Sequence, residues 1–239
     1  MSKGTLLLFP NLLGDHPHHE VFLPSSVDKA VNTIDGLIAE SVKGGRRFLS
    51  RFKMEKPPHL VPLALLNEHT KEDEIDFLLE PLKNGERWGL ISDAGIPCVA
   101  DPGSQLVRRA YQIGIKVQAF VGPSSLMMAL MLSGLPAQKF TFHGYLPRDV
   151  ESLKAKLKEM EKLSKQDHST HLWIETPYRN TGMLNTALES LDAQTCFCMA
   201  AGLTLPTQKV MSWPIETWKK YHSLPDLEDL PTVFLLNAR

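Results

Sequence analysis

Short apolar runs alternate with amphipathic stretches along the whole chain, and this alternation predicts the fold. In the first half, the runs that predict buried strands lie at 6–9, 60–65 and 88–91. The segments with helical spacing lie at 27–39, 45–52 and 72–82. A further strand is expected at 116–121, followed by an apolar helix that Ser124 or Ser125 begins and Gly134 ends. This order of elements is typical of a doubly wound α/β fold.

After residue 136 the pattern changes, because the later strands have few helices between them. The strands expected there lie at 140–145, 171–174, 195–201, 209–213 and 232–236, and the helices at 150–163 and 178–191. We therefore predict two α/β domains. The N-terminal domain, 1–122, is doubly wound, and the C-terminal domain, 123–239, is built on a mixed sheet.

Composition and charge exclude several classes of protein. Hydrophobic residues make up 43% of the chain and charged residues 22%, which is typical of globular proteins. Lys and Arg number 26 against 27 Asp and Glu, so no global field points to a nucleic-acid or membrane partner. The longest uncharged stretch, 117–138, is interrupted by Gly-Pro and Gly-Leu-Pro sequences. We therefore expect no membrane span, no signal peptide and, with only three cysteines, a cytoplasmic protein.

Two loops that follow predicted strands carry candidate chemistry. The first, 91–103, is acidic and has two glycines and two prolines. It fits a ligand loop in which Asp93 accepts hydrogen bonds, or an ordinary connection in which Asp101 starts a helix. The second, 121–125, fits either an anion-binding loop or a plain helix cap. No dinucleotide or nucleotide phosphate-binding motif is present.

Two polar clusters have alternative interpretations. His16, His18 and His19 flank a proline in a spacing that matches no regular metal motif, so no metal is expected. A basic segment fits either RNA phosphate contacts or a solvated helix face. Its members are Lys43, Arg46, Arg47, Arg51, Lys53 and Lys56.

The loops together resemble the tetrapyrrole methylase superfamily of S-adenosylmethionine-dependent methyltransferases, and in particular its ribosomal RNA small-subunit methyltransferase I branch. The resemblance rests on motifs that span most of the chain. They are Gly4-Thr5-Leu6 with Pro10 and Gly14, Ile38-Ala39-Glu40, His69, Ser92-Asp93-Ala94-Gly95-Ile96-Pro97, Asp101-Pro102-Gly103, Gly122-Pro123-Ser124, Gly134-Leu135-Pro136, Gly144-Tyr145-Leu146-Pro147 and Glu175-Thr176-Pro177-Tyr178-Arg179.

This resemblance implies a cofactor, S-adenosyl-L-methionine, held in a cleft between the two domains of a homodimer. The positions that match the family's cofactor-binding residues are Leu13, Asp93, Ile96, Ser124, Ser125 and, in the second domain, Thr176, Leu203 and Thr232. The resemblance does not identify a catalytic residue. Glu40, Lys43 and Arg179 are candidates on motif position, and each also fits a structural ion pair.

The acceptor side departs from the RNA-modifying branch. Its Glu-Asp-Thr-Arg is here Glu40-Ser41-Val42-Lys43, and its Arg-Glu-Leu-Thr-Lys segment falls on Ala201-Gly202-Leu203-Thr204-Leu205-Pro206. Its Lys-Gly-Glu is replaced by 227–231, and we expect no counterpart of its C-terminal extension. From the branch that the chain resembles most, we expect a methyltransferase for ribosomal RNA ribose 2′-oxygens on the small subunit, although these departures favour methyltransferase activity in general over that acceptor. The alternatives are a methyltransferase for a small molecule such as a tetrapyrrole, and a non-catalytic S-adenosylmethionine-binding protein.

Overall fold

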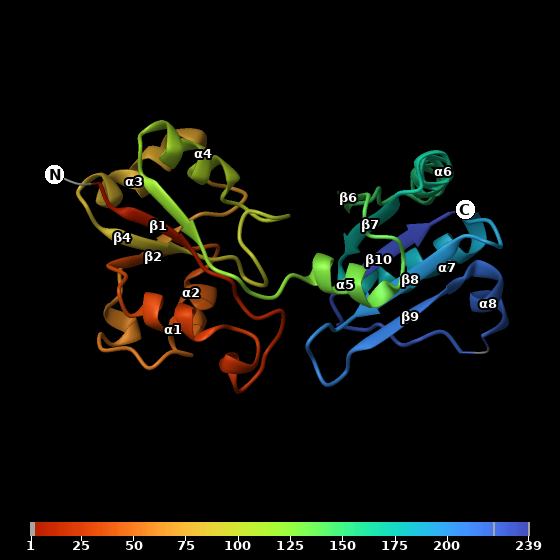
Figure 1. The fold of residues 1–239 in the computed structure, drawn as a ribbon, viewed down its shortest axis with the longest axis horizontal. Helices are drawn as coiled ribbons and strands as arrows, with labels where there is room; N and C mark the ends of the chain where they lie inside the picture. The colour runs from red at the N-terminus through yellow and green to blue at the C-terminus, as the bar shows by residue number, and fades with distance from the viewer. Residues whose placement is uncertain (1–2, 222, 239) are drawn as a thin grey trace. The chain divides into compact units, whose positions relative to one another are not determined.

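The computed structural model describes residues 3–221 and 223–238, which form two compact units (Figure 1). The first unit is Met1–Ser124 and the second is Ser125–Arg239. Each unit is an α/β fold around one five-stranded sheet, which confirms the predicted fold class.

The first unit is built on a parallel sheet with the strand order β3-β2-β4-β1-β5. Its strands are β1 (Thr5–Leu8), β2 (Gly36–Ala39), β3 (Leu63–Leu65), β4 (Arg87–Leu90) and β5 (Lys116–Ala119). The four helices are α1 (Ser25–Val31), α2 (Val42–Leu49), α3 (Ile75–Lys83) and α4 (Ser104–Gln112). Short 3-10 helices lie at His19–Val21, Pro58–Leu60 and Glu72–Glu74.

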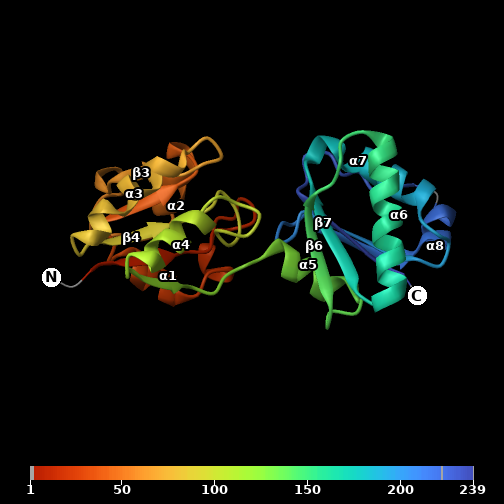
Figure 2. The same cartoon turned by 90° about the horizontal axis from the view of Figure 1, so that it is seen from above.

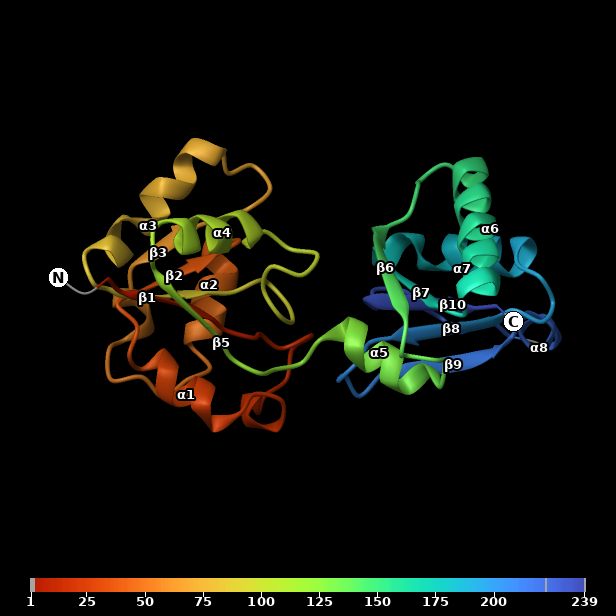
Figure 3. The same cartoon turned by 45° about the horizontal axis from the view of Figure 1, so that its top comes forward.

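The helices of the first unit cover both faces of its sheet (Figure 3). On one face, Leu7 and Leu37 belong to a buried cluster with residues of α1 and α2. On the other face, Leu6 and Ile38 pack with residues of α3 and α4. Because neighbouring residues of a strand point to opposite faces, the central strands are continuously apolar, as expected for a doubly wound parallel sheet.

One element prediction in this unit was wrong. The segment 27–39 was expected to be a single helix, but α1 ends at Val31 and β2 begins at Gly36. All four residues of β2 are buried, so its sequence has no alternation by which a strand could be recognised. Gly36 is needed because a Cβ there would lie within 2.4 Å of the Trp88 ring.

The second unit is built on a mixed sheet with the order β6-β7-β10-β8-β9. Its strands are β6 (Phe140–Tyr145), β7 (Thr170–Glu175), β8 (Cys196–Ala201), β9 (Lys209–Pro214) and β10 (Thr232–Asn237). Only β6 and β7 pair in parallel. The helices are α5 (Ser125–Ser133), α6 (Val150–Asp167), α7 (Asn180–Ser190) and α8 (Ile215–Lys220), with a 3-10 helix at Pro177–Arg179.

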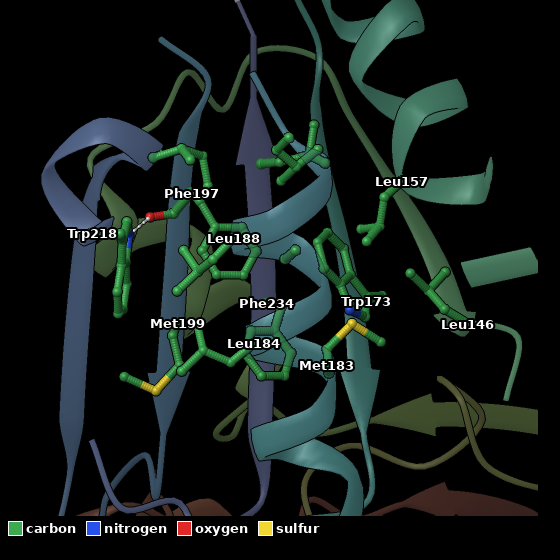
Figure 4. Packing of buried hydrophobic residues seen from close by; sticks show 14 of the residues in the cluster. Leu146, Leu157, Trp173, Met183, Leu184, Leu188, Phe197, Met199, Trp218 and Phe234 are labelled. Atoms are coloured by element: carbon green, nitrogen blue, oxygen red, sulfur yellow. Dashed lines mark hydrogen bonds between the residues drawn. The ribbon is translucent and has the colours of Figure 1, made fainter. Parts of the chain in front are cut away.

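The core of this unit lies between the sheet and one layer of helices. Figure 2 shows α6 and α7 on one side of the sheet and α5 on the other. Trp173, Phe234 and Phe197 lie on β7, β10 and β8 and pack together with ring centroids 5.8–6.1 Å apart (Figure 4). The indole nitrogen of Trp218, on α8, donates to the Phe197 carbonyl oxygen at 2.9 Å and fastens that helix to the sheet.

Candidate functional site

The topology of the first unit indicates a candidate binding site at the carboxyl ends of β1 and β4. These strands are neighbours, but the chain leaves β1 for α1 on one face of the sheet and leaves β4 for α4 on the other. The two connections diverge at the carboxyl ends of these strands, and such a switch point is where open α/β sheets generally bind ligands.

Three loops meet at Gly95, in the connection after β4. A Cβ at this position would lie 3.2 Å from Leu13 Cδ2 and 3.6 Å from the Pro123 carbonyl oxygen. Gly95 also has a φ of +71°, in the left-handed region that glycine adopts without strain. The structure therefore brings together the predicted loops that contain Leu13, Asp93, Ile96 and Ser124. Ser125 is the first residue of α5.

Three carboxyl groups gather beside this meeting point. The backbone amide of Asp93 donates to Glu40 Oε1 at 2.9 Å, and the Ser41 hydroxyl lies 3.5 Å from Asp93 Oδ1. The Asp93 side chain lies over the first turn of α2, where a Cβ on Gly44 would come within 2.2 Å of Oδ1. The Asp93 carboxyl group therefore lies beside the N-terminus of α2, next to the backbone of Gly44.

The third carboxyl group, Asp101, is perturbed by its surroundings. Burial, together with the charges of Glu40 and Asp93, raises the pKa of Asp101 to about 7. Burial also raises the pKa of Glu40, and the nearby Asp93 charge adds to that effect. Gathered carboxyl groups that resist ionisation are typical of functional sites, where a cation or a proton relieves their repulsion.

The connection after β4 is conformationally strained. Within nine residues, Gly95, Cys98, Ala100 and Gly103 all have positive φ, at 71°, 71°, 62° and 132°. For Cys98 and Ala100 this conformation costs roughly 1–2 kcal/mol each. Such strain persists where surrounding contacts hold it, and it concentrates at binding loops. Asp101 does not start the following helix, because the N-cap residue is Gly103.

Sequence reasoning missed the residue that joins the first two loops. Asn11 is 1% exposed and its side-chain amide donates to the carbonyl oxygens of Ser92 and Asp93 at 2.9 and 3.0 Å. The sequence signal for Asn11 is weak, because it is only a polar residue that follows an apolar strand and Pro10. Of the catalytic candidates, Glu40 belongs to the site, whereas Lys43 is exposed in the first turn of α2.

In the second unit, the residues predicted to contact the cofactor lie at one end of the strands. Thr232 begins β10 and pairs with Glu175 at the end of β7 and with Ala201 at the end of β8. Thr176 directly follows β7, and Leu203 is two residues past the end of β8. Both therefore lie at the end of the sheet where β10 begins with Thr232. Arg179 pairs with Glu175 at 3.1 Å and donates to the Pro147 carbonyl oxygen at 2.9 Å, which makes it a structural residue of this unit.

The basic segment is not a continuous solvated face. Arg46 is half-buried and its Nη1 donates to the Pro58 and Val61 carbonyl oxygens. Arg51 is half-buried and donates to Asn11 Oδ1 at 2.8 Å. These two arginines therefore have partners within the protein, which neither interpretation of the segment had included. The exposed members are Lys43, Arg47, Lys53 and Lys56.

The histidine-rich loop is held by local contacts. His19 Nε2 lies 2.8 Å from Asp28 Oδ1 and its ring packs edge-on against Phe52, while His16 Nδ1 accepts from the His18 amide. Within residues 3–221 and 223–238, no group of three or more His, Cys, Asp or Glu side chains could hold a metal ion. In the same ranges, no helix combines the length and apolar composition that crossing a bilayer requires.

Comparison with known proteins identifies the family. Residues 23–218 match the model of the tetrapyrrole (corrin/porphyrin) methylases. The ribosomal RNA small subunit methyltransferase I of Vibrio cholerae is 30% identical over 189 residues, which cover 78% of this chain and 62% of that protein. The protein of the same name from Thermotoga maritima is 31% identical and covers 71% of this chain and 72% of its own length.

The fold agrees with this assignment. The crystal structure of the methyltransferase CobJ superposes with a TM-score of 0.64 at 17% identity, covering 99% of this chain and 94% of that one. Its similarity concerns the fold alone, whereas the family match covers most of the sequence. The chain belongs to the tetrapyrrole (corrin/porphyrin) methylases.

Proposed function

We propose that the protein is an S-adenosylmethionine-dependent methyltransferase that acts on ribosomal RNA of the small subunit, at a ribose 2′-oxygen. The observation that carries the proposal is the meeting of the loops of Leu13, Asp93 and Pro123 at the carboxyl ends of β1 and β4. The relatives named for ribosomal RNA methylation support the choice of acceptor.

The residues at this meeting point of loops fit the proposed cofactor. S-adenosylmethionine carries positive charge on its sulfur and its amino group, and three carboxyl groups, from Glu40, Asp93 and Asp101, interact there. Gly95 lets the loops of Leu13 and Pro123 approach its backbone closely, because a Cβ there would lie 3.2 Å from Leu13 Cδ2. The bound cofactor supplies a methyl group on an already activated leaving group.

The role of the chain is then to bind and orient. The Asp93 carboxyl group, at the N-terminus of α2, is proposed to accept hydrogen bonds from the cofactor, and the Glu40 side chain keeps the Asp93 backbone in place. Correct alignment of reacting groups contributes roughly 7–11 kcal/mol to such displacements, so a conspicuous catalytic dyad is not required. Thr176, Leu203 and Thr232 are proposed as cofactor contacts of the second unit.

The acceptor is proposed to bind partly through the exposed lysines of the basic segment. Lys43, Lys53 and Lys56 are solvent-exposed, whereas the Arg47 charge is partly offset by Asp15 at 3.2 Å. Replacing the three lysines with alanine is expected to weaken RNA binding. The slope of the logarithm of the binding constant against the logarithm of the salt concentration is also expected to become less steep. The change should be about 0.7–0.9 for each phosphate that the protein no longer neutralises. A triple alanine variant at exposed lysines of the second unit, Lys162, Lys219 and Lys220, is the matched control.

The activity is tested by supplying the protein and tritium-labelled S-adenosylmethionine to ribosomal small subunits from cells that lack it. We expect label in RNA, at a nucleotide whose ribose methylation blocks alkaline cleavage. Label that appears only in small molecules would favour a small-molecule methyltransferase, a function that the altered acceptor motif at Glu40-Ser41-Val42-Lys43 also supports. Tight cofactor binding with no transfer to any acceptor would indicate a non-catalytic binding protein.

A cytoplasmic homodimer is proposed as the working form. The cytoplasm contains the ribosomal RNA and keeps thiols reduced, and Cys98, Cys196 and Cys198 are free thiols. Helix α5 supports self-association, because Met131 is 79% exposed and Leu132 is 46% exposed. Replacing Met131 with glutamate is expected to shift the protein toward monomer in analytical ultracentrifugation, and an unchanged mass would exclude α5 from the interface.

A further inference from the structure

The loops after β1 and β4 are tied together by the backbone and side chain of Asn11. The Asn11 amide donates to the Gly95 carbonyl oxygen at 2.7 Å, and the Gly95 amide donates to the Leu12 carbonyl oxygen at 3.4 Å. The Asn11 side chain adds two bonds, from Nδ2 to the carbonyl oxygens of Ser92 and Asp93. Four hydrogen bonds therefore fix the position of one loop on the other.

The orientation of the Asn11 amide group is set by two donors on its other side. Asn11 Oδ1 accepts from the Leu12 backbone amide at 2.9 Å and from Arg51 Nη1 at 2.8 Å. If the amide group were flipped, its NH2 would face both donors and its oxygen would face two carbonyl oxygens. Arg51 is charged and half-buried, so its hydrogen bond is of the stronger, charge-assisted kind.

Arg51 lies outside both loops. It follows α2, which ends at Leu49, whereas Asp93 lies at the other end of that helix, beside its first turn. The Arg51 side chain extends toward the loop after β1. Burial lowers the pKa of Arg51, and the neighbouring Arg47 charge acts in the same direction. Burying this cation costs free energy, which the bond to Asn11 offsets.

We infer that Arg51 is a positioning residue for cofactor binding, acting through Asn11 to hold the Asp93 and Gly95 loop in its binding conformation. The inference rests on the proposed function, because it assumes that this loop binds S-adenosylmethionine. It assigns Arg51 to the donor side of the reaction and removes it from the acceptor surface.

Arg46 provides a matched control. Like Arg51 it is half-buried, but it lies on α2 and its guanidinium donates to the backbone carbonyl oxygens of Pro58 and Val61, on the connection that leads to β3. Replacing Arg46 with methionine removes comparable hydrogen bonds without touching the loops after β1 and β4. If a less stable α2 were the only cause of weaker cofactor binding, Arg46→Met and Arg51→Met would lose affinity to the same extent.

The experiment compares wild type, Arg51→Met, Arg51→Lys and Arg46→Met by calorimetric titration with S-adenosylmethionine. The same proteins are examined without ligand by amide hydrogen exchange at Asn11, Leu12 and Gly95. Arg51→Met is expected to bind about tenfold more weakly, close to the effect of losing one charge-assisted hydrogen bond. Its loop amides are expected to exchange faster. Arg51→Lys keeps the charge and one donor, so it is expected to recover part of the affinity.

Equal affinity in Arg51→Met and wild type, with unchanged exchange, would overturn the inference. An equal loss of affinity in Arg46→Met would also overturn it, because the effect would then belong to α2 as a whole. If Arg51→Met does not fold, the cofactor affinity and loop exchange of Arg51→Lys are compared with those of Arg46→Met, and the same two results would overturn the inference. Failure of the wild-type protein to bind the cofactor would instead contradict the proposed function, and hydrogen exchange would still show whether Arg51 holds the loop.

Discussion

Replacing Asp101 with asparagine should stabilise the protein at neutral and alkaline pH. Burial, with the charges of Glu40 and Asp93, raises the pKa of Asp101 from 3.8 to about 7, so the folded protein resists ionisation of this carboxyl. Each pKa unit corresponds to about 1.4 kcal/mol, which sets an upper limit of about 4 kcal/mol. Because solvent reaches this partly exposed group, we expect about 1–3 kcal/mol. Asparagine preserves the shape of the side chain and carries no charge.

The sign of the pH dependence follows from proton binding. Between pH 4 and 7 the folded protein keeps the Asp101 proton while the unfolded chain loses it, so stability falls as pH rises through this window. Above pH 7 both states are ionised and the penalty is constant. The advantage of Asp101→Asn should therefore be absent near pH 4, grow up to pH 7 and then level off.

Urea denaturation of both proteins, followed by circular dichroism at several pH values from 5 to 8.5, measures this difference. A variant less stable than wild type at pH 8 would mean that the ionised carboxylate is stabilising, contrary to the reasoning. An advantage that does not change with pH would assign the effect to hydrogen bonding or packing and not to charge.

Three further substitutions test other parts of the structure. Ala100→Gly should raise stability in thermal unfolding by about 0.5–1 kcal/mol, because glycine relieves the left-handed backbone, and a loss would show that this backbone is not strained. Gly44→Ala should displace Asp93 from α2 and weaken cofactor binding in calorimetry, whereas unchanged affinity would exclude that contact. Glu161→Leu should destabilise the second unit by about 2–4 kcal/mol in urea, because buried Glu161 accepts from the Thr195 hydroxyl and a backbone amide, and a neutral effect would contradict this.

The sequence was sufficient for the main lines of the fold and for the loops of the first unit. Strands such as β1 and β4 are short apolar runs that end in glycine- and proline-rich loops, and this punctuation is local. The failure at β2 is physical in origin, because a strand buried on both faces shows no period by which it can be told from a helix.

Long-range partners could not be read from the sequence. Arg46 and Arg51 are identical in type to the exposed Arg47, and only the folded chain shows that their guanidinium groups meet carbonyl and amide oxygens. The raised pKa of Asp101 likewise depends on Glu40, which is distant in sequence and follows a strand that had not been predicted.

The most direct test of the proposed cofactor site is calorimetric titration of S-adenosylmethionine into wild type and Asp93→Ala. The wild-type protein should bind, and Asp93→Ala should lose about 1–3 kcal/mol of binding free energy, the cost of removing one partner of a charged hydrogen bond. Asp73→Ala, at an exposed acidic position in the 3-10 helix before α3, should bind as wild type does. Wild-type affinity in Asp93→Ala, or no binding by the wild-type protein, would contradict the assignment of the cofactor site to the loops after β1 and β4.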